Sequence, residues 1–119
     1  MTIDQIAQQI SQEVTGGRSV SARPQARVET RGIAIEYDAE PYPEVDSAFA
    51  AYRRVAAIEA ALLSYSVRPA QEADRVRARV TASVQVEGHT YFGHGVDDDV
   101  VAGSVRAFAA AVDQVSMAA

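Results

Sequence analysis

The chain has 119 residues, 48% hydrophobic and 23% charged, a composition typical of one folded domain rather than a disordered chain. Its formal net charge is −5 and its arginines are dispersed along the chain, so the usual electrostatic signature of nucleic acid binding is missing. With 0 cysteines it has no disulfide or thiolate metal site. No apolar run approaches the ~20 residues of a membrane helix, and no signal-peptide pattern opens the chain. We therefore expect a cytoplasmic protein without nucleic acid or membrane partners.

The first predicted element is an amphipathic helix over Thr2 to Val14. Thr2 can cap it, and Gly16-Gly17 can end it. Its apolar positions recur at helical spacing: Ile3, Ile6, Ala7, Ile10 and Val14. This stripe packs either on the chain's own domain or on a partner chain. We therefore treat residues 1–17 as a separate helix and 18–119 as a single α+β domain.

In the next part of the chain the apolar period changes to two, which predicts strands. The expected elements are a strand from Val20 to Val28, a turn at Arg31-Gly32, a strand from Ile33 to Tyr37, a break at Pro41-Tyr42-Pro43 and a helix from Glu44 to Ala60. Pro24 inside the first strand indicates an edge position or a bulge, because proline donates no hydrogen bond to a neighbouring strand.

The second half repeats this order of elements. We expect a strand over Leu63 to Val67, a polar loop over Pro69 to Asp74 and a strand over Val76 to Glu87. A turn at Glu87-Gly88 leads into a strand over His89 to Val96. A helix capped by Asp97, Asp98 or Asp99 then continues to Val115, and Ser116 to Ala119 form a frayed tail. Strict alternation from Val76 to Val86 predicts one buried and one wet face, as in an antiparallel sheet.

An offset of 56 positions aligns the two halves without a gap. It places Ala26 on Ala82, Gly32 on Gly88 and Phe49 on Val105. The predicted fold is therefore α+β, with two β-β-(β)-α units, about 18–60 and 61–115, related by a pseudo-two-fold axis. An antiparallel sheet packs on the helices of this fold, and the N-terminal helix is additional.

Few residues of this chain suggest catalysis or metal binding. His89 and His94 are five residues apart on one strand, so they lie on opposite faces and form no compact metal pair. Asp97 to Asp99 is a helix-capping turn rather than a cation site. Gly93 and Gly95 permit close approach of a helix or a ligand. We therefore expect no metal, no cofactor and no catalytic group, and we interpret Tyr65 as a core residue whose hydroxyl needs a partner.

Two stretches carry a resemblance to a known family. The runs LLSYSVRPA (62–70) and GHGVDDDVVAGSVRAFAAAV (93–112), with EVDSAF (44–49) in the first half, resemble the C-terminal regulatory domain of 2-isopropylmalate synthase and citramalate synthase. This similarity covers about residues 18–115. It implies an allosteric domain that forms a homodimer and binds leucine or isoleucine. The family's catalytic TIM barrel typically needs ~250 residues, so we expect a stand-alone domain acting on a separate synthase subunit.

The resemblance also implies ligand-binding positions. These are Glu44, Val45, Asp46 and Ser47 at the first helix, Leu62 and Tyr65 on the strand after it, and Val76 and Ala78 on the next strand. The family's G-x-G-P loop is replaced here by Pro41-Tyr42-Pro43-Glu44, which removes two glycines and adds a carboxylate.

Two alternatives remain open. In the first, the family scaffold is reused as a small cofactor-free biosynthetic enzyme, with Glu44, Tyr65, His89 or His94 in the altered pocket. In the second, the chain is a purely structural dimerisation subunit.

Overall fold

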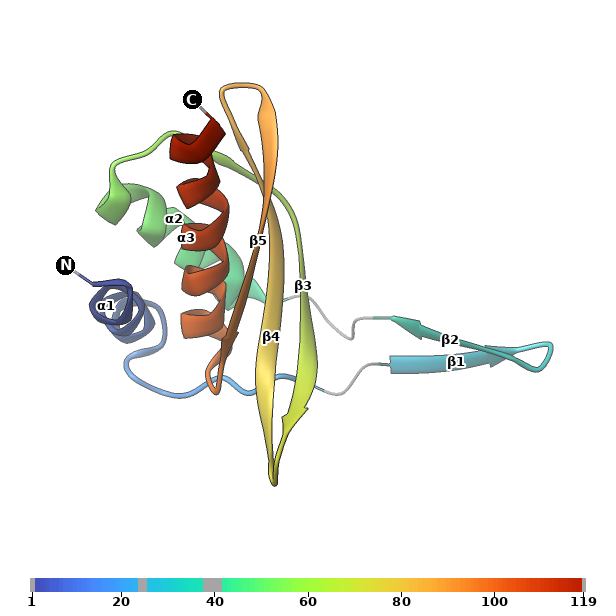
Figure 1. Ribbon diagram of the computed structural model, residues 1–119. Helices are drawn as coiled ribbons and strands as arrows, with labels where there is room; N and C mark the ends of the chain where they lie inside the picture. The colour runs from blue at the N-terminus through green and yellow to red at the C-terminus, as the bar shows by residue number, and fades with distance from the viewer. Residues whose placement is uncertain (1, 24–25, 38–41, 119) are drawn as a thin grey trace.

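The computed structural model describes residues 2–23, 26–37 and 42–118, and within them the chain forms an α+β fold, as the sequence predicts. Figure 1 shows the helices on one side of an antiparallel sheet and a separate β-hairpin reaching out on the other side. In chain order the elements are α1 (Ile3–Thr15), β1 (Ala26–Thr30), β2 (Ile33–Tyr37), α2 (Pro43–Ala56), β3 (Ala61–Glu72), β4 (Arg75–Val86), β5 (His89–Asp97) and α3 (Val100–Ala118).

The N-terminal helix belongs to the core of the chain. Thr2 and Gln5 form a reciprocal capping box, and Gly16 closes the helix in the left-handed conformation. Ala7 and Ile10 are almost completely buried, and α1 packs against α2 and α3. Of the two predicted roles for its apolar stripe, packing on the chain's own domain is confirmed.

The three-stranded sheet has the order β3-β4-β5. The predicted buried face of β4 is confirmed from Ala78 to Val84, where Ala78, Val80, Ala82 and Val84 are all buried, although Ser83 on the other face is buried as well. Val76, expected on the same buried face, is instead 56% exposed, because β5 reaches only as far as Ala78.

None of the described helices combines the length and the apolar character needed to cross a membrane.

Two glycines bring α3 directly onto β5. A Cβ atom on Gly93 would lie 2.6 Å from the Ala111 nitrogen, and one on Gly95 would lie 2.7 Å from the Ala107 nitrogen. Real Cβ atoms do not approach backbone this closely, so the helix rests on the strand only because both side chains are absent. The predicted close approach of helix and strand is confirmed.

Aromatic side chains join α2 to α3 in the core. The rings of Phe49 and Phe108 meet edge to face with centroids 5.0 Å apart, and Tyr52 lies 6.1 Å from Phe108. Burial raises the pKa of the Tyr52 hydroxyl, and the nearby Asp113 carboxylate raises it further.

The strand predicted from Val20 is wrong at its start. The structure has no regular element over residues 18–23, and β1 begins at Ala26; Pro24 lies outside the described residues. The backbone of Val20 is already occupied, because its N–H donates to Asp99 Oδ1 at 2.7 Å and its carbonyl accepts from the Val100 N–H at 2.7 Å. These two bonds tie the segment to the start of α3 instead of to a sheet.

Three element ends also differ from the predictions. Helix α2 ends at Ala56 instead of Ala60, since Ala57 adopts the left-handed conformation that glycine usually supplies. The predicted loop over Pro69 to Asp74 is wrong, because β3 continues to Glu72 and turns at Ala73 and Asp74. Proline is tolerated there since β3 is an edge strand. Finally, α3 continues to Ala118 where a frayed tail was expected.

Candidate functional site

A small pocket lies between the first turn of α2 and strand β3. Its volume is about 300 Å³. It is lined by Asp46, Leu62, Leu63, Ser64 and Tyr65. A β-bulge between Leu62 and Ser64 interrupts the pairing with β4, and it allows consecutive strand residues to line one hollow. The structure thus brings together three predicted site residues, Asp46, Leu62 and Tyr65.

The Tyr65 hydroxyl fixes the wall of this pocket. It donates to the Tyr42 carbonyl at 3.1 Å and accepts from the Tyr42 N–H at 3.1 Å. Tyr42 is the N-cap residue of α2, and its side chain makes no cap hydrogen bond, so Tyr65 holds the start of this helix against β3. The predicted need of the Tyr65 hydroxyl for a partner is confirmed.

Removing this hydroxyl tests its contribution to the fold. Tyr65→Phe is expected to lower the free energy of unfolding by about 1–2 kcal/mol, because the Tyr42 N–H loses its acceptor and the Tyr42 carbonyl keeps only the Val45 N–H. Urea denaturation measures the change. Tyr91→Phe is the matched control, since the Tyr91 hydroxyl makes no hydrogen bond within the described residues. Equal effects of the two variants would show that the Tyr65 hydroxyl does not stabilise the start of α2.

The pocket combines one negative charge with an apolar wall. Asp46 stands in the first turn of α2, where the helix dipole favours a carboxylate. Leu62 and Leu63 supply the apolar surface, and the Ser64 hydroxyl lies 2.7 Å from that of Ser83. A volume of about 300 Å³ is at the lower end for small-ligand sites. The pocket thus presents a carboxylate beside an apolar wall, which is the chemistry that would complement an ammonium group next to an aliphatic chain.

The other predicted site residues lie elsewhere. Val45 and Ala78 are buried in the core, and Val76 is exposed near the start of β4. Glu44 lines a different hollow with Arg18, and Ser47 lines a third one between α1 and α2. Consecutive helix residues point about 100° apart, so the side chains from Glu44 to Ser47 are spread around the helix and do not all line this pocket. Leu63 and Ser64 were missed because the strand pattern does not reveal the bulge.

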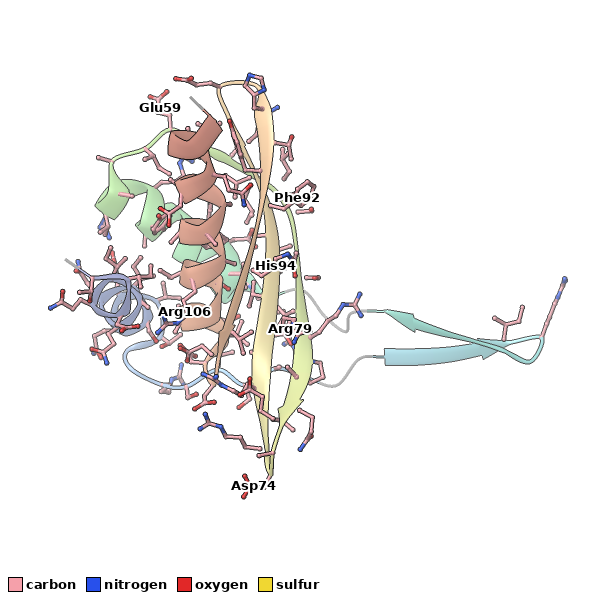
Figure 2. All side chains as sticks on the ribbon, in the orientation of Figure 1. Glu59, Asp74, Arg79, Phe92, His94 and Arg106 are labelled. Carbon is pink, nitrogen blue, oxygen red and sulfur yellow. The ribbon has the colours of Figure 1, made fainter. Side chains whose placement is uncertain are left out.

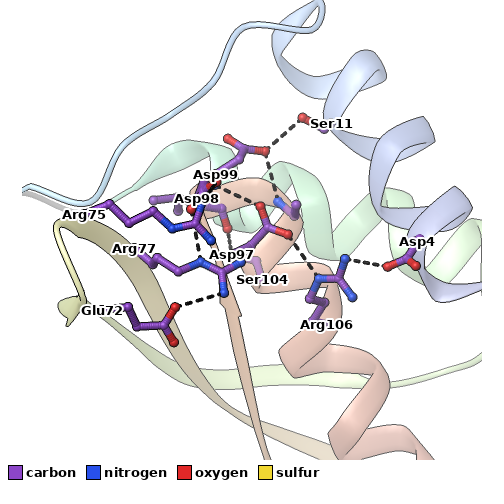
Figure 3. Close-up of polar contacts among 12 residues, drawn as sticks. Asp4, Ser11, Glu72, Arg75, Arg77, Asp97, Asp98, Asp99, Ser104 and Arg106 are labelled. Atoms are coloured by element: carbon purple, nitrogen blue, oxygen red, sulfur yellow. Dashed lines mark hydrogen bonds and ion pairs between the residues drawn. The ribbon is translucent and has the colours of Figure 1, made fainter.

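A polar cluster at the start of α3 connects three parts of the chain (Figure 3). Asp99 caps α3 by accepting from the Ala102 N–H at 3.1 Å. It also accepts from Ser11 Oγ at 3.0 Å and from the Val20 N–H at 2.7 Å. Arg106 bridges Asp97 and Asp4 of α1. The predicted capping role of the acidic run is confirmed, whereas the partners on α1 carried no signal in the sequence.

The histidines remain apart. His89 pairs with Val86 at the turn, and His94 lies opposite Thr81, with its Nδ1 3.0 Å from the Thr81 hydroxyl. Within residues 2–23, 26–37 and 42–118, no group of three or more histidine, aspartate or glutamate side chains is placed to hold a metal ion.

Comparison with known proteins gives consistent results. The family model described as LeuA allosteric (dimerisation) domain matches residues 4–116. The chain is 32% identical over 101 residues to 2-isopropylmalate synthase of Microcystis aeruginosa, covering 82% of this chain and 19% of that protein. It is 32% identical over 85 residues to 2-isopropylmalate synthase of Staphylococcus carnosus, covering 71% of this chain and 14% of that protein. It is 30% identical over 71 residues to 2-isopropylmalate synthase of Heliobacterium modesticaldum, covering 60% of this chain and 14% of that protein.

No solved structure shows a significant match. The chain spans only 14–19% of the length of these three curated relatives. The family match begins at residue 4 and so includes α1, which shares its core with α2 and α3. The match extends over nearly the whole chain, and the chain therefore belongs to the LeuA allosteric (dimerisation) domain family.

Proposed function

We propose that this chain is a regulatory domain that forms a homodimer in the cytoplasm, binds an amino-acid-like ligand and acts on a separate synthase subunit. The family match supports the regulatory role. The observation that carries the ligand part is the pocket in which Asp46 of α2 meets Leu62 and Tyr65 of β3.

The chemistry of the pocket favours a branched-chain amino acid. A ligand ammonium group can form a charge-assisted hydrogen bond with the Asp46 carboxylate. An aliphatic side chain can pack on Leu62 and Leu63. Because the Asp46 carboxylate is the charged group of this pocket, the pocket favours the ammonium end of the ligand over its carboxylate.

Isothermal titration calorimetry with leucine, isoleucine and valine tests the proposal. Asp46→Asn is expected to weaken binding at least 10-fold, because a hydrogen bond between charged groups typically contributes about 1.5–3 kcal/mol. Glu44→Gln is the matched control, since it removes one carboxylate from the same helix turn but from a different hollow. Its affinity is expected to stay within 2-fold of the parent.

The result separates the parts of the proposal. Loss of binding in Glu44→Gln but not in Asp46→Asn would show that the pocket is wrongly assigned. No binding heat with any of the three amino acids, together with no synthase subunit co-purifying from the native source, would contradict both the ligand and the partner.

A further inference from the structure

The side of the three-stranded sheet that faces away from α3 is called the open face below. The strand register arranges its side chains in rows that cross the strands. One row contains Arg68 of β3 and Arg79 of β4, and the second row from it contains Phe92 of β5. Both arginines are exposed, and Phe92 is 58% exposed. Figure 2 shows Arg79, Phe92 and His94 pointing away from the helix.

The two arginines of the open face lack a counter-ion. Arg68 and Arg79 are direct partners in the pairing of β3 with β4, and the Cβ atoms of such partners lie about 5 Å apart. Neither guanidinium group forms an ion pair within the described part of the chain. Like charges directly opposite each other destabilise a sheet. The fold therefore holds two positive charges together without any described group that offsets their repulsion.

The other arginines of β4 are neutralised by the chain itself. Arg75 pairs with Asp98, and Arg77 pairs with both Asp98 and Glu72. Carboxylates are in excess, because the chain has 16 acidic residues against 11 lysines and arginines. Even so, none of the described carboxylates reaches the arginine pair of the open face. This contrast favours a carboxylate that comes from another molecule.

The polar groups between the arginine pair and Phe92 satisfy one another. The Thr81 hydroxyl lies 3.0 Å from His94 Nδ1. The hydroxyls of Ser64 and Ser83 are 2.7 Å apart, and Ser83 is itself buried. The main groups left in these rows to contact another molecule are thus the two guanidinium groups and the Phe92 ring. These rows lie four strand residues apart, which corresponds to about 13 Å.

We infer that the open face docks an extended acidic segment of a partner protein. A carboxylate of the segment lies between Arg68 and Arg79, because a guanidinium group binds a carboxylate through two parallel hydrogen bonds. An aliphatic side chain four residues away lies on the same side of an extended segment and reaches Phe92. Exposed aromatic and arginine side chains are typical of protein interfaces. This inference goes beyond the proposed function and does not involve the pocket at Asp46.

The net charge of the chain argues for a short acidic segment over a nucleic acid. A nucleic acid adds one negative charge per phosphate, and a chain of net charge −5 repels such a polyanion. A segment with one or two carboxylates adds little repulsion, and it gains the attraction of two nearby guanidinium groups. Only a few residues are needed to cover the distance from the arginine pair to Phe92.

A synthetic peptide provides the probe. It has one leucine at its centre, one glutamate four residues away on each side, serine and glycine elsewhere, and blocked ends. The full chain, labelled with nitrogen-15, is titrated with this peptide and followed by NMR. We expect shifts in the amides around Arg68, Arg79 and Phe92. A peptide with glutamine in place of glutamate, and one with both glutamates moved next to the leucine, are each expected to bind at least 3-fold more weakly.

Variants of the chain test the assigned residues. Arg68→Gln, Arg79→Gln and Phe92→Ala are each expected to weaken binding of the peptide at least 3-fold. Arg75→Gln is the matched control, since it removes the same charge from β4 but from a residue paired with Asp98. Its affinity is expected to stay within 2-fold of the parent. Equal weakening by Arg75→Gln and Arg79→Gln would overturn the inference, because only the total charge would then matter.

The unfolding of the free chain gives an independent readout. Arg79→Gln is expected to raise the urea midpoint relative to Arg75→Gln, because it removes the repulsion with Arg68. A lower midpoint would show that the fold already neutralises Arg79, and it would contradict the inference.

Three further results would overturn the proposed occupant. The first is the absence of shifts at millimolar peptide. The second is a stronger response of the same amides to inorganic phosphate than to the peptide, which would indicate a general anion site. The third is the dissociation of a parent dimer by Arg79→Gln in light scattering, which would assign the open face to a second copy.

Discussion

Replacing Gly93 with alanine is expected to lower the free energy of unfolding by about 3 kcal/mol or more. A Cβ atom there meets the carbonyl of Ala107 and the nitrogen of Ala111, which are backbone atoms of α3. Overpacking of a core usually costs about 1–3 kcal/mol when side chains can adjust. Here the helix itself must move away from β5, so the cost lies at or above that range. Urea denaturation followed by circular dichroism measures the change.

Gly103→Ala is the control for this experiment. It makes the same chemical change on α3, but its Cβ would lie 3.3 Å from Val80 Cγ2 rather than against backbone. Alanine also gains about 1 kcal/mol of helix propensity over glycine. We therefore expect a net change within about 1 kcal/mol. If Gly93→Ala proved as mild as Gly103→Ala, the direct contact between α3 and β5 would not constrain the fold.

Asp99→Ala is expected to lower the free energy of unfolding by about 3 kcal/mol. Loss of an N-cap alone costs about 0.5–2 kcal/mol. This substitution also leaves the Val20 N–H and the Ser11 hydroxyl without their acceptor. Part-buried donors without a partner add about 1–3 kcal/mol. Since Asp99 connects α3 to α1, hydrogen exchange in α1 should become faster by more than the global loss of stability predicts.

The neighbouring aspartate provides a control of the same residue type. Asp98 is well exposed and pairs with Arg75 and Arg77, both at the surface of β4. Exposed ion pairs contribute little to stability, so Asp98→Ala is expected to change it by less than about 1 kcal/mol. Similar losses for Asp98→Ala and Asp99→Ala would contradict the central role given to Asp99.

Local patterns predicted the elements whose signals lie within a few residues. The Thr2 cap with Gly16 predicted α1, and the alternation through Val80 predicted β4, because periodicity and capping are local properties. The elements that differed depend on distant partners. Val20 leaves the predicted strand because Asp99, far along the chain, binds its N–H. Likewise, Pro69 stays in a strand because the sheet order makes β3 an edge.

The candidate site was predictable only in part. Asp46, Leu62 and Tyr65 meet in one pocket, and all three were expected from the family resemblance. The residues beside Asp46 on α2 point to other parts of the molecule, since a helix turns about 100° at each residue. Leu63 enters the pocket through a bulge, which shifts the strand register in a way that alternation of residue types does not show.

The outer edge of β3 has a consequence for how this chain associates. A long free edge exposes a row of unpaired backbone groups, which can recruit further strands and start fibrils. In β3 the row is broken twice, by the bulge after Leu62 and by Pro69, which has no N–H to offer. Growth by adding strands side by side is therefore obstructed at both ends of the strand. This edge of the sheet is therefore a poor starting point for fibril growth.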